Sequence, residues 1–193
     1  MRTLFGLVFA MLALAGCGAS GPSFNNTDIT GADYGKDFSL TDHTGKGRTL
    51  ADFRGKVVVM FFGYTRCPDV CPTTLAELKA VKDQLGQDAG RLQVLFVTVD
   101  PERDTPKLLA NYVPAFDPGF LGLYGDSAAT AKVAKDFRVF YQKAPGKTPE
   151  TYTVDHTAGS YVFDPQGRLR LFARHGNADK LIADIRILFR SSG

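Results

Sequence analysis

Two cysteines, each followed by proline, are the residues of this chain with the clearest chemical potential. Cys67 and Cys71 lie four positions apart in the run Cys-Pro-Asp-Val-Cys-Pro. Two thiols at this spacing can bind a soft metal ion or close into a disulfide. Because a residue that precedes proline tends to avoid the helical conformation, we expect neither cysteine to lie inside a regular helix.

The sequence after the cysteines predicts the start of a helix. Pro72 suits a first helical position, which would make Cys71 the N-cap, although a capping box from Thr74 to Glu77 allows a start two residues later. In either case Cys71 lies near the positive end of a helix. We therefore expect the pKa of the Cys71 thiol to be lowered.

Three histidines are available to complete a metal site. Copper(I) prefers thiolates, and an imidazole can complete its low-coordinate set, whereas zinc requires a fourth ligand. His156 falls between two strand-like stretches, where a loop can carry it over the cysteines; the alternative on pattern alone is a solvent-facing loop residue. His43, in a turn, and His175, at the start of the last helix, are expected to be non-functional, with an accessory ligand role for His175 as the alternative.

The cysteines follow a buried strand. Residues 57–62 form a near-continuous apolar run, and a second such run covers residues 92–99. Apolar residues at helical spacing lie between them, from Leu75 to Leu85. A functional site commonly lies in the loop after a central strand of an α/β sheet, which is where the cysteines fall.

The remaining elements follow the same patterns. A hairpin is expected around residues 42–47, helices at 105–112, 127–137 (with Ser127 as N-cap) and 181–189, and strands at 152–154, 160–163 and 168–172. Strand–helix–strand units followed by a hairpin and a terminal helix predict an α/β fold with a mixed central sheet and flanking helices.

The first 16 residues have the pattern of a signal peptide. Arg2 supplies a positive start, and the apolar run at residues 4–14 is too short to cross a bilayer. Residues 14–17 resemble the lipobox of bacterial lipoproteins, in which Cys17 becomes the lipidated first residue; an ordinary signal peptide with an unmodified Cys17 is the alternative. We expect residues 17–34 to be a flexible tether and residues 35–193 a single domain, exported and held at a membrane.

Composition limits the remaining function classes. The net charge is +3 and the basic residues are scattered, so nothing favours a nucleic-acid partner. With Cys17 set aside, Cys67 and Cys71 are the two cysteines that remain in the sequence. A disulfide between distant parts of the domain is therefore excluded, and the thiol chemistry must be local.

These motifs together match a known family. From about Phe24 to the C-terminus the chain resembles the Sco/SenC family of copper proteins, which assist assembly of the dicopper centre of cytochrome c oxidase. The matching pieces are residues 28–31, 61–72, 99–106 and 155–157, with Tyr161. The resemblance implies a thioredoxin-like fold with a β-hairpin insertion, and copper, as Cu(I) or Cu(II), bound by Cys67, Cys71 and His156.

The resemblance also implies partners. They are the cytochrome c oxidase subunit that carries the dicopper centre and a further periplasmic copper donor. Many relatives are anchored by a transmembrane helix, whereas this chain is expected to use a lipid on the periplasmic side of a bacterial membrane.

Several acidic and basic residues are expected around the ligands. We expect Asp155 to orient or charge-balance His156 and Asp69 to face the same loop, with solvated loop carboxylates as the alternative. Residues Asp100, Arg103 and Asp104 either shape a loop near the site or dock a partner; the sequence leaves this open.

Three functions compete for the same thiols. The first is a copper metallochaperone, and the second is a thiol–disulfide oxidoreductase in which Cys67 and Cys71 reduce the acceptor's copper-ligand cysteines. The third is a peroxidase of the peroxiredoxin type. The peroxiredoxin pattern requires a proline where this chain has Met60 and Phe61, and the spacing from Thr65 to Cys67 is one residue too short for that pattern. We therefore set the peroxidase function aside.

Overall fold

A mixed sheet forms the centre of the computed structural model, which describes residues 22–148 and 151–191. The expected signal peptide and Cys17 lie outside these residues. The strands of the main sheet are β1 (Thr27–Asp28), β2 (Leu40–Asp42), β3 (Gly47–Arg48), β4 (Val57–Gly63), β5 (Leu92–Thr98), β6 (Leu121–Tyr124), β9 (Ser160–Phe163) and β10 (Leu169–Ala173). Their order across the sheet is β1-β10-β9-β4-β5-β6-β2-β3.

The two central strands are the apolar runs that the sequence predicts as strands. β4 pairs with β5 in parallel, from Val57 opposite Leu92 to Gly63 opposite Thr98, and with β9 in the antiparallel sense. Every residue of β4 and β5 is buried. Burial on both faces explains why neither strand alternates apolar and polar residues.

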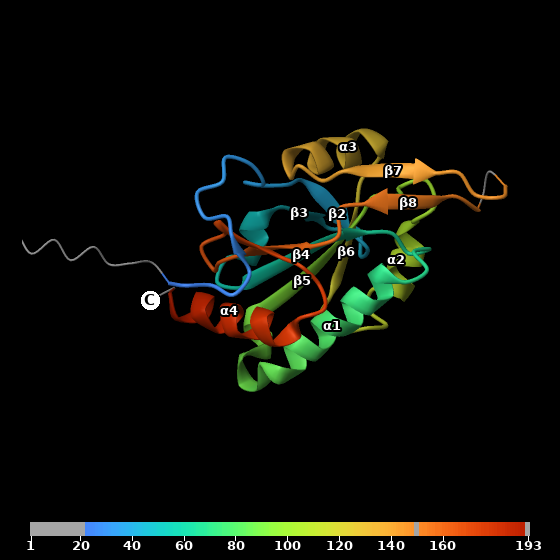
Figure 1. Ribbon diagram of the computed structural model, residues 1–193. Coiled ribbons are helices and arrows are strands. Elements are labelled where there is room, and N and C mark those ends of the chain that lie inside the picture. The colour runs from blue at the N-terminus through green and yellow to red at the C-terminus, as the bar shows by residue number, and fades with distance from the viewer. Residues whose placement is uncertain (1–21, 149–150, 192–193) are drawn as a thin grey trace, which may run out of the picture.

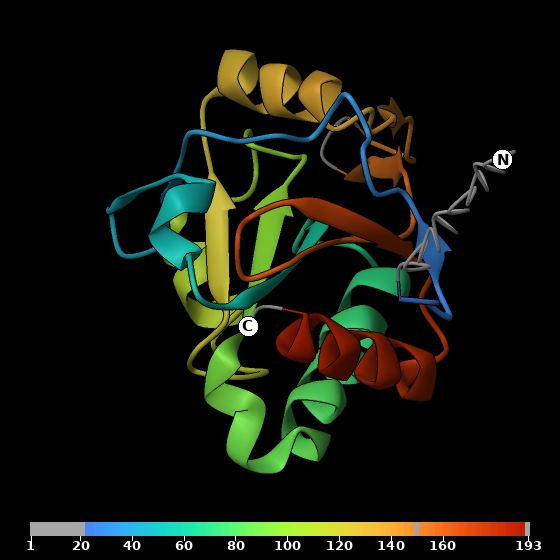
Figure 2. The same ribbon diagram turned by 90° about the vertical axis from the view of Figure 1, so that its left-hand side faces the viewer.

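Helices cover both faces of the sheet. They are α1 (Val70–Gln84), α2 (Pro106–Tyr112), α3 (Ser127–Asp136) and α4 (Ala178–Arg190), with 3-10 turns η1 (Leu50–Phe53) and η2 (Gly86–Arg91). Figures 1 and 2 show α1 and α4 side by side on one face and α3 across the other. This arrangement confirms the predicted α/β class. Within the described part of the chain, no helix has the length and apolar character needed to cross a bilayer.

A separate two-stranded sheet projects from the main one. It consists of β7 (Tyr141–Ala144) and β8 (Thr153–His156), which pair in the antiparallel sense with Tyr141 opposite His156. Neither strand pairs with the main sheet. The position of this hairpin relative to the core therefore depends on side-chain contacts and on its short connections to α3 and β9, and not on a continuous hydrogen-bonded ladder.

The structure corrects several local expectations. α1 begins at Val70 with Asp69 as N-cap, so Cys71 lies inside the first turn and is not the N-cap. The turn tolerates Pro72 because its missing N–H would have no helical acceptor there. The N-cap of α3 is Asp126, whose side chain accepts a hydrogen bond from the backbone of Ala129, and not Ser127.

The described part of the expected tether is packed on the domain. β1 pairs with β10, with Thr27 opposite Phe172. The Asp184 side chain of α4 accepts hydrogen bonds from the backbone and side-chain amides of Asn25 and Asn26. The folded domain thus begins before residue 35.

Candidate metal centre

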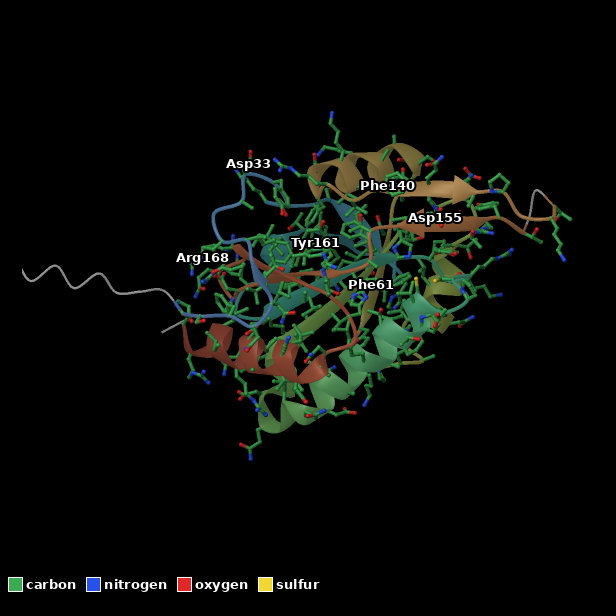
Figure 3. The ribbon with its side chains drawn as sticks, viewed as in Figure 1. Asp33, Phe61, Phe140, Asp155, Tyr161 and Arg168 are labelled. Carbon is green, nitrogen blue, oxygen red and sulfur yellow. The ribbon has the colours of Figure 1, made fainter. Side chains whose placement is uncertain are left out.

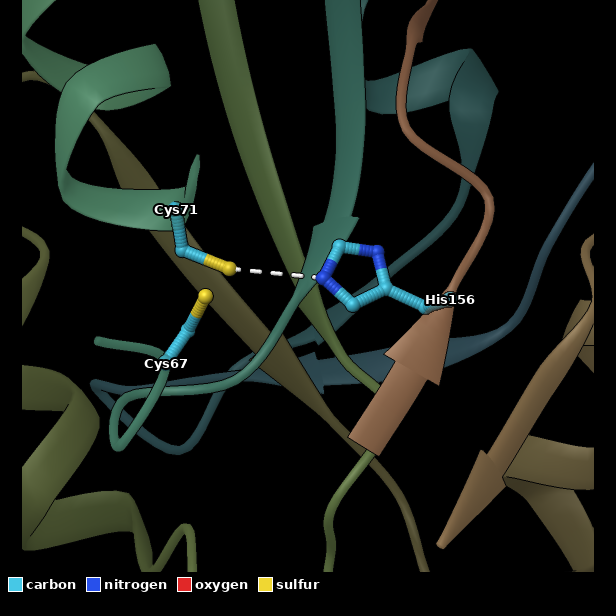
Figure 4. Close-up of side chains that lie close together, drawn as sticks. All are labelled: Cys67, Cys71 and His156. Carbon is cyan, nitrogen blue, oxygen red and sulfur yellow. Dashed lines mark hydrogen bonds between the residues drawn. The ribbon is translucent and has the colours of Figure 1, made fainter. Parts of the chain in front are cut away.

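Three elements bring the two cysteines and a histidine together. Cys67 lies on the loop after β4, Cys71 in the first turn of α1, and His156 at the end of β8 (Figure 4). The Sγ atom of Cys71 is 3.5 Å from Nε2 of His156. The candidate ligand atoms of all three residues lie within 4.8 Å of one another. His156 is thus not a solvent-facing loop residue.

The Cys71 thiol is tightly enclosed. Cys71 is fully buried, and a Cβ atom at Gly63 would lie only 2.8 Å from its sulfur and 2.9 Å from the Phe96 ring. Glycine at the end of β4 therefore leaves the space that the thiol occupies. Cys67 is half-buried, and it lines, with His156, a pocket of about 420 Å³ that gives access from the surface.

Burial also controls the protonation of the site. Desolvation, reinforced by the neighbouring Cys67, raises the pKa of the Cys71 thiol well above its usual value. The expected lowering by the helix end is therefore wrong, because burial outweighs the helix dipole. A metal ion that binds here must displace a proton from the Cys71 thiol.

The imidazole is held ready to act as a ligand. Burial lowers the pKa of His156, which favours the neutral ring. Its Nδ1 lies 3.2 Å from the backbone oxygen of Thr157. Since that oxygen can only accept, Nδ1 carries the proton and Nε2 presents its lone pair to the cysteines. The rings of Phe61 and Tyr64 pack edge-on against the imidazole, with centroids 6.1 and 6.0 Å away.

The two expected acidic neighbours lie on the same pocket. Asp69 and Asp155 are both exposed and both line it with Cys67 and His156, and Figure 3 shows Asp155 on the β7–β8 hairpin. Asp69 also accepts a hydrogen bond from the Thr73 hydroxyl at 3.4 Å. Both are thus close to the ligands, and the effect of Asp155 on His156 stays a prediction.

The other two histidines have structural contacts. Nδ1 of His43 accepts the backbone N–H of Gly122 at 3.0 Å, which joins a turn to β6. His175 bridges two hydroxyls, Thr74 at 3.0 Å and Ser160 at 3.1 Å. Neither histidine belongs to the cysteine–histidine group found among the described residues.

The loop after β5 supports the site in a way that the sequence left open. Asp104 accepts hydrogen bonds from the backbone and hydroxyl of Thr65, two residues before Cys67, and from the Thr98 hydroxyl. Asp100 and Arg103 form a buried ion pair next to it. In the sequence, acidic residues directly after a buried strand indicate a loop near the site, but they do not show which residues their side chains contact.

The domain has a mixed sheet with flanking helices, and a Cys-Cys-His group lies at the end of its central strand. These features place it among domains with a thioredoxin-like fold. A family model described as SCO1/SenC matches residues 26–190. The chain therefore belongs to the SCO1/SenC family.

Curated relatives agree with this assignment. The mitochondrial SCO2 homolog of Bos taurus is 42% identical over 153 residues, covering 78% of this chain and 58% of that protein. The mitochondrial SCO1 homolog of Homo sapiens is 39% identical over 154 residues, covering 78% of this chain and 51% of that protein. The chain thus spans between half and three fifths of the length of these relatives.

Solved structures share the fold. ScoI of Bradyrhizobium japonicum with copper bound is 44% identical, with a TM-score of 0.73 over 80% of this chain and 98% of that one. Yeast Sco1 with copper bound is 32% identical, with a TM-score of 0.75 over 84% of this chain and 91% of that one. Apo Sco1 of Thermus thermophilus is 44% identical, with a TM-score of 0.76 over 86% of this chain and 97% of that one.

Proposed function

We propose that the protein is a copper metallochaperone that serves cytochrome c oxidase assembly. It binds copper through Cys67, Cys71 and His156 and passes the ion to the dicopper centre of the oxidase. The observation that carries this proposal is the convergence of two thiols and one imidazole nitrogen within 4.8 Å. Two similar solved proteins hold copper, and a more distant one, BsSco, is named as a member of the Sco family of cytochrome c oxidase assembly proteins.

The donor set suits a cargo ion that must be released. Two thiolates and an imidazole satisfy copper(I) in a three-coordinate site, whereas zinc would lack its fourth ligand. Binding releases the thiol protons, and transfer to an acceptor returns them. The half-buried Cys67 and the pocket beside it give an incoming acceptor thiolate access to the ion, so that ligands can be exchanged one at a time.

Membrane attachment is a second part of the proposal. Cleavage before Cys17 and lipidation of that cysteine would place the domain on the extracytoplasmic side of a bacterial membrane. A solved SCO1/SenC family lipoprotein from Bacillus anthracis, 25% identical to this chain, supports this anchor.

Transfer can be tested with purified proteins. The reduced domain is loaded with one equivalent of copper(I) and mixed anaerobically with the soluble domain of the oxidase subunit that forms the dicopper centre. We expect copper to move to the reduced acceptor. Cys67→Ser and Cys71→Ser variants should fail to load. Wild-type protein with intact thiols that retains no copper would contradict the proposal.

A second function uses the same thiols and rests on their accessibility. Cys67 is half-buried at the pocket and Cys71 lies directly behind it in α1. The Cys67 thiolate would attack an acceptor disulfide, and Cys71 would then break the mixed disulfide. The acceptor gains two electrons and two protons, and the chain ends as a Cys67–Cys71 disulfide that offers no thiolate to copper.

His156 separates the two functions. Thiol–disulfide exchange needs no imidazole at this position, whereas the three-ligand copper site does. His156→Ala should therefore weaken copper binding and leave reduction of an acceptor disulfide largely unchanged. Equal loss of both activities would show that His156 acts on the thiols themselves.

A further inference from the structure

His156 is carried by a hairpin that the main sheet does not hold. β7 and β8 form a sheet of their own, and His156 is the last residue of β8. A small displacement of this hairpin would move Nε2 away from the Cys71 sulfur. Other contacts must therefore set the geometry of the site.

The hairpin contacts the core through the buried side chain of Val154, and one arginine joins its start to the loop after β5. The guanidinium of Arg103 lies 3.5 Å from the centroid of the Tyr152 ring, which directly precedes β8. Its Nη1 donates a hydrogen bond to the Tyr152 backbone oxygen at 2.8 Å. Its Nε donates to Asp100 at 2.5 Å, and the Tyr152 hydroxyl donates to the other oxygen of Asp100 at 2.7 Å.

Two members of this cluster are largely buried, and the third, Tyr152, is half-buried. The side chain of Asp100 is fully buried, and that of Arg103 is only 10% exposed. A planar guanidinium that stacks on a ring and donates in two directions leaves little freedom to the groups it joins. By contrast, the ion pair between Lys143 of the hairpin and Glu102 of the loop after β5 is exposed and contributes little.

The same loop also holds the cysteine side of the site. Asp104, the next residue, accepts hydrogen bonds from Thr65 on the cysteine loop. The Tyr64 ring lies 5.8 Å from Arg103 and 6.0 Å from the His156 ring. Tyr152 directly precedes β8 and His156 ends it four residues later, which corresponds to about 13 Å of extended chain.

We propose, on the basis of the copper site above, that Asp100, Arg103 and Tyr152 form a clamp that positions His156 over the two cysteines. None of the three is a ligand. Each acts through the hairpin, by fixing the start of β8 and thus the place of the imidazole at its end. Mutation of residues that orient the metal ligands, without binding the metal themselves, commonly lowers metal affinity by about 10–100-fold.

The chain contains a matched control for the clamp. Arg91 stacks on Phe189 at 4.2 Å, donates to the Phe189 backbone oxygen at 3.2 Å, and pairs with Asp88 three residues earlier. This is the same combination of contacts, with Arg91 and Asp88 more exposed at 45% and 48%, at a place that holds no part of the cysteine–histidine group. Arg91→Lys therefore reports what the loss of such a stack does to the fold alone.

The test is a double-mutant cycle in the reduced protein. Arg103→Lys keeps the charge but loses the planar guanidinium that stacks on Tyr152. We expect it to lower copper(I) affinity, measured against a competing chelator, about tenfold. In a His156→Ala background the same change should have no further effect, and Arg91→Lys should have none in either background. Tyr152→Phe, which keeps the ring and loses the bond to Asp100, should cause a smaller loss.

A second measurement does not depend on copper. In the reduced metal-free protein, the His156 ring resonances in an NMR spectrum should shift in Arg103→Lys and stay unchanged in Arg91→Lys. Unchanged resonances, or a loss of affinity that is equal with and without His156, would overturn the clamp. If the wild-type chain binds no copper, the proposed function fails, and the NMR comparison still decides whether the clamp positions His156.

Discussion

At the scale of single residues, the site depends on one position that has no side chain. Gly63 ends β4, and a Cβ atom there would lie 2.8 Å from the Cys71 sulfur, 2.9 Å from Phe96 and 3.0 Å from Phe61. All three neighbours are fully buried, so none has room to move aside. The thiol and the glycine are therefore two parts of one packing arrangement.

Gly63→Ala should damage both the fold and the copper site. Overpacking of a well-filled core typically costs about 1–3 kcal/mol of unfolding free energy, and here the strain falls on the Cys71 side chain. Chemical denaturation and copper titration measure the two effects. Gly90→Ala is the control, because nothing lies within 4 Å of a Cβ atom there. Equal stability and affinity in both variants would contradict this account of the packing.

The residues of the site could be predicted to different extents. The spacing and prolines marked Cys67 and Cys71, whereas His156 stood out only through the family resemblance, because 85 residues separate it from Cys71. The prediction that the pKa of the Cys71 thiol is lowered was wrong for a physical reason. The sequence shows that a helix starts nearby, but it does not show the burial that raises the thiol pKa.

At the scale of elements, the sequence predicts best where the apolar pattern is strong. β4 and β5 are confirmed because burial on both faces requires an unbroken apolar run, and α1 and α4 are confirmed because burial of one face gives a helical period. β7 was missed because its four residues, Tyr141–Ala144, are mostly polar and largely exposed. β6 was missed because it is short, and a glycine lies within it.

The cap of α3 gives a direct test at this scale. Asp126 accepts the backbone N–H of Ala129 at 2.7 Å, whereas Ser127 is the first helical residue. Asp126→Ala should lower the unfolding free energy by about 1 kcal/mol, since it removes the acceptor for an otherwise unpaired N–H. Ser127→Ala should change stability by at most a few tenths of that amount. Thermal or chemical unfolding measures both losses. A larger loss in Ser127→Ala than in Asp126→Ala would show that Ser127 is the N-cap, as the sequence predicts.

The β2–β3 hairpin links stability to pH. Burial alone would raise the pKa of Asp42, but hydrogen bonds from Thr44, Arg48 and the backbone of Lys46 lower it from 3.8 to about 2. A lowered pKa means that the ionised carboxylate stabilises the fold above the unfolded value of 3.8. This contribution is lost as the pH falls from 3.8 through the folded-state value.

Asp42→Asn should therefore be less stable than wild type near neutral pH, and the difference should shrink in acid. Unfolding free energies measured across the acid range give the comparison. Asp179→Asn serves as a control, because Asp179 is an exposed carboxylate of α4, away from the hairpin. A gap between Asp42→Asn and wild type that does not change with pH would show that the Asp42 charge is not what stabilises the hairpin.

At the scale of the whole molecule, one buried carboxylate joins the two ends of the described chain. Asp184 of α4 is fully buried and accepts four hydrogen bonds of 2.8–2.9 Å from Asn25 and Asn26. These contacts hold the segment that leads into β1 against the last helix.

Asp184→Ala should release the N-terminal segment. Hydrogen bonds to a charged group each contribute about 1.5–3 kcal/mol, so we expect the unfolding free energy to fall by at least about 2 kcal/mol. Amide hydrogen exchange at Asn25 and Asn26 should rise, while the copper site stays intact. Asp179→Ala, at an exposed position of the same helix, is the control. Unchanged exchange at these amides would refute this role for Asp184.

The central claim is that Cys67, Cys71 and His156 form one copper site. The most direct test is an anaerobic copper titration of the fully reduced chain from Phe24 onward, against a competing chelator, for wild type and His156→Ala. We predict one tightly bound copper per wild-type chain and much weaker binding by His156→Ala. Weak binding by both proteins, or equal binding by both, would contradict the three-ligand site and leave the thiols as a redox pair.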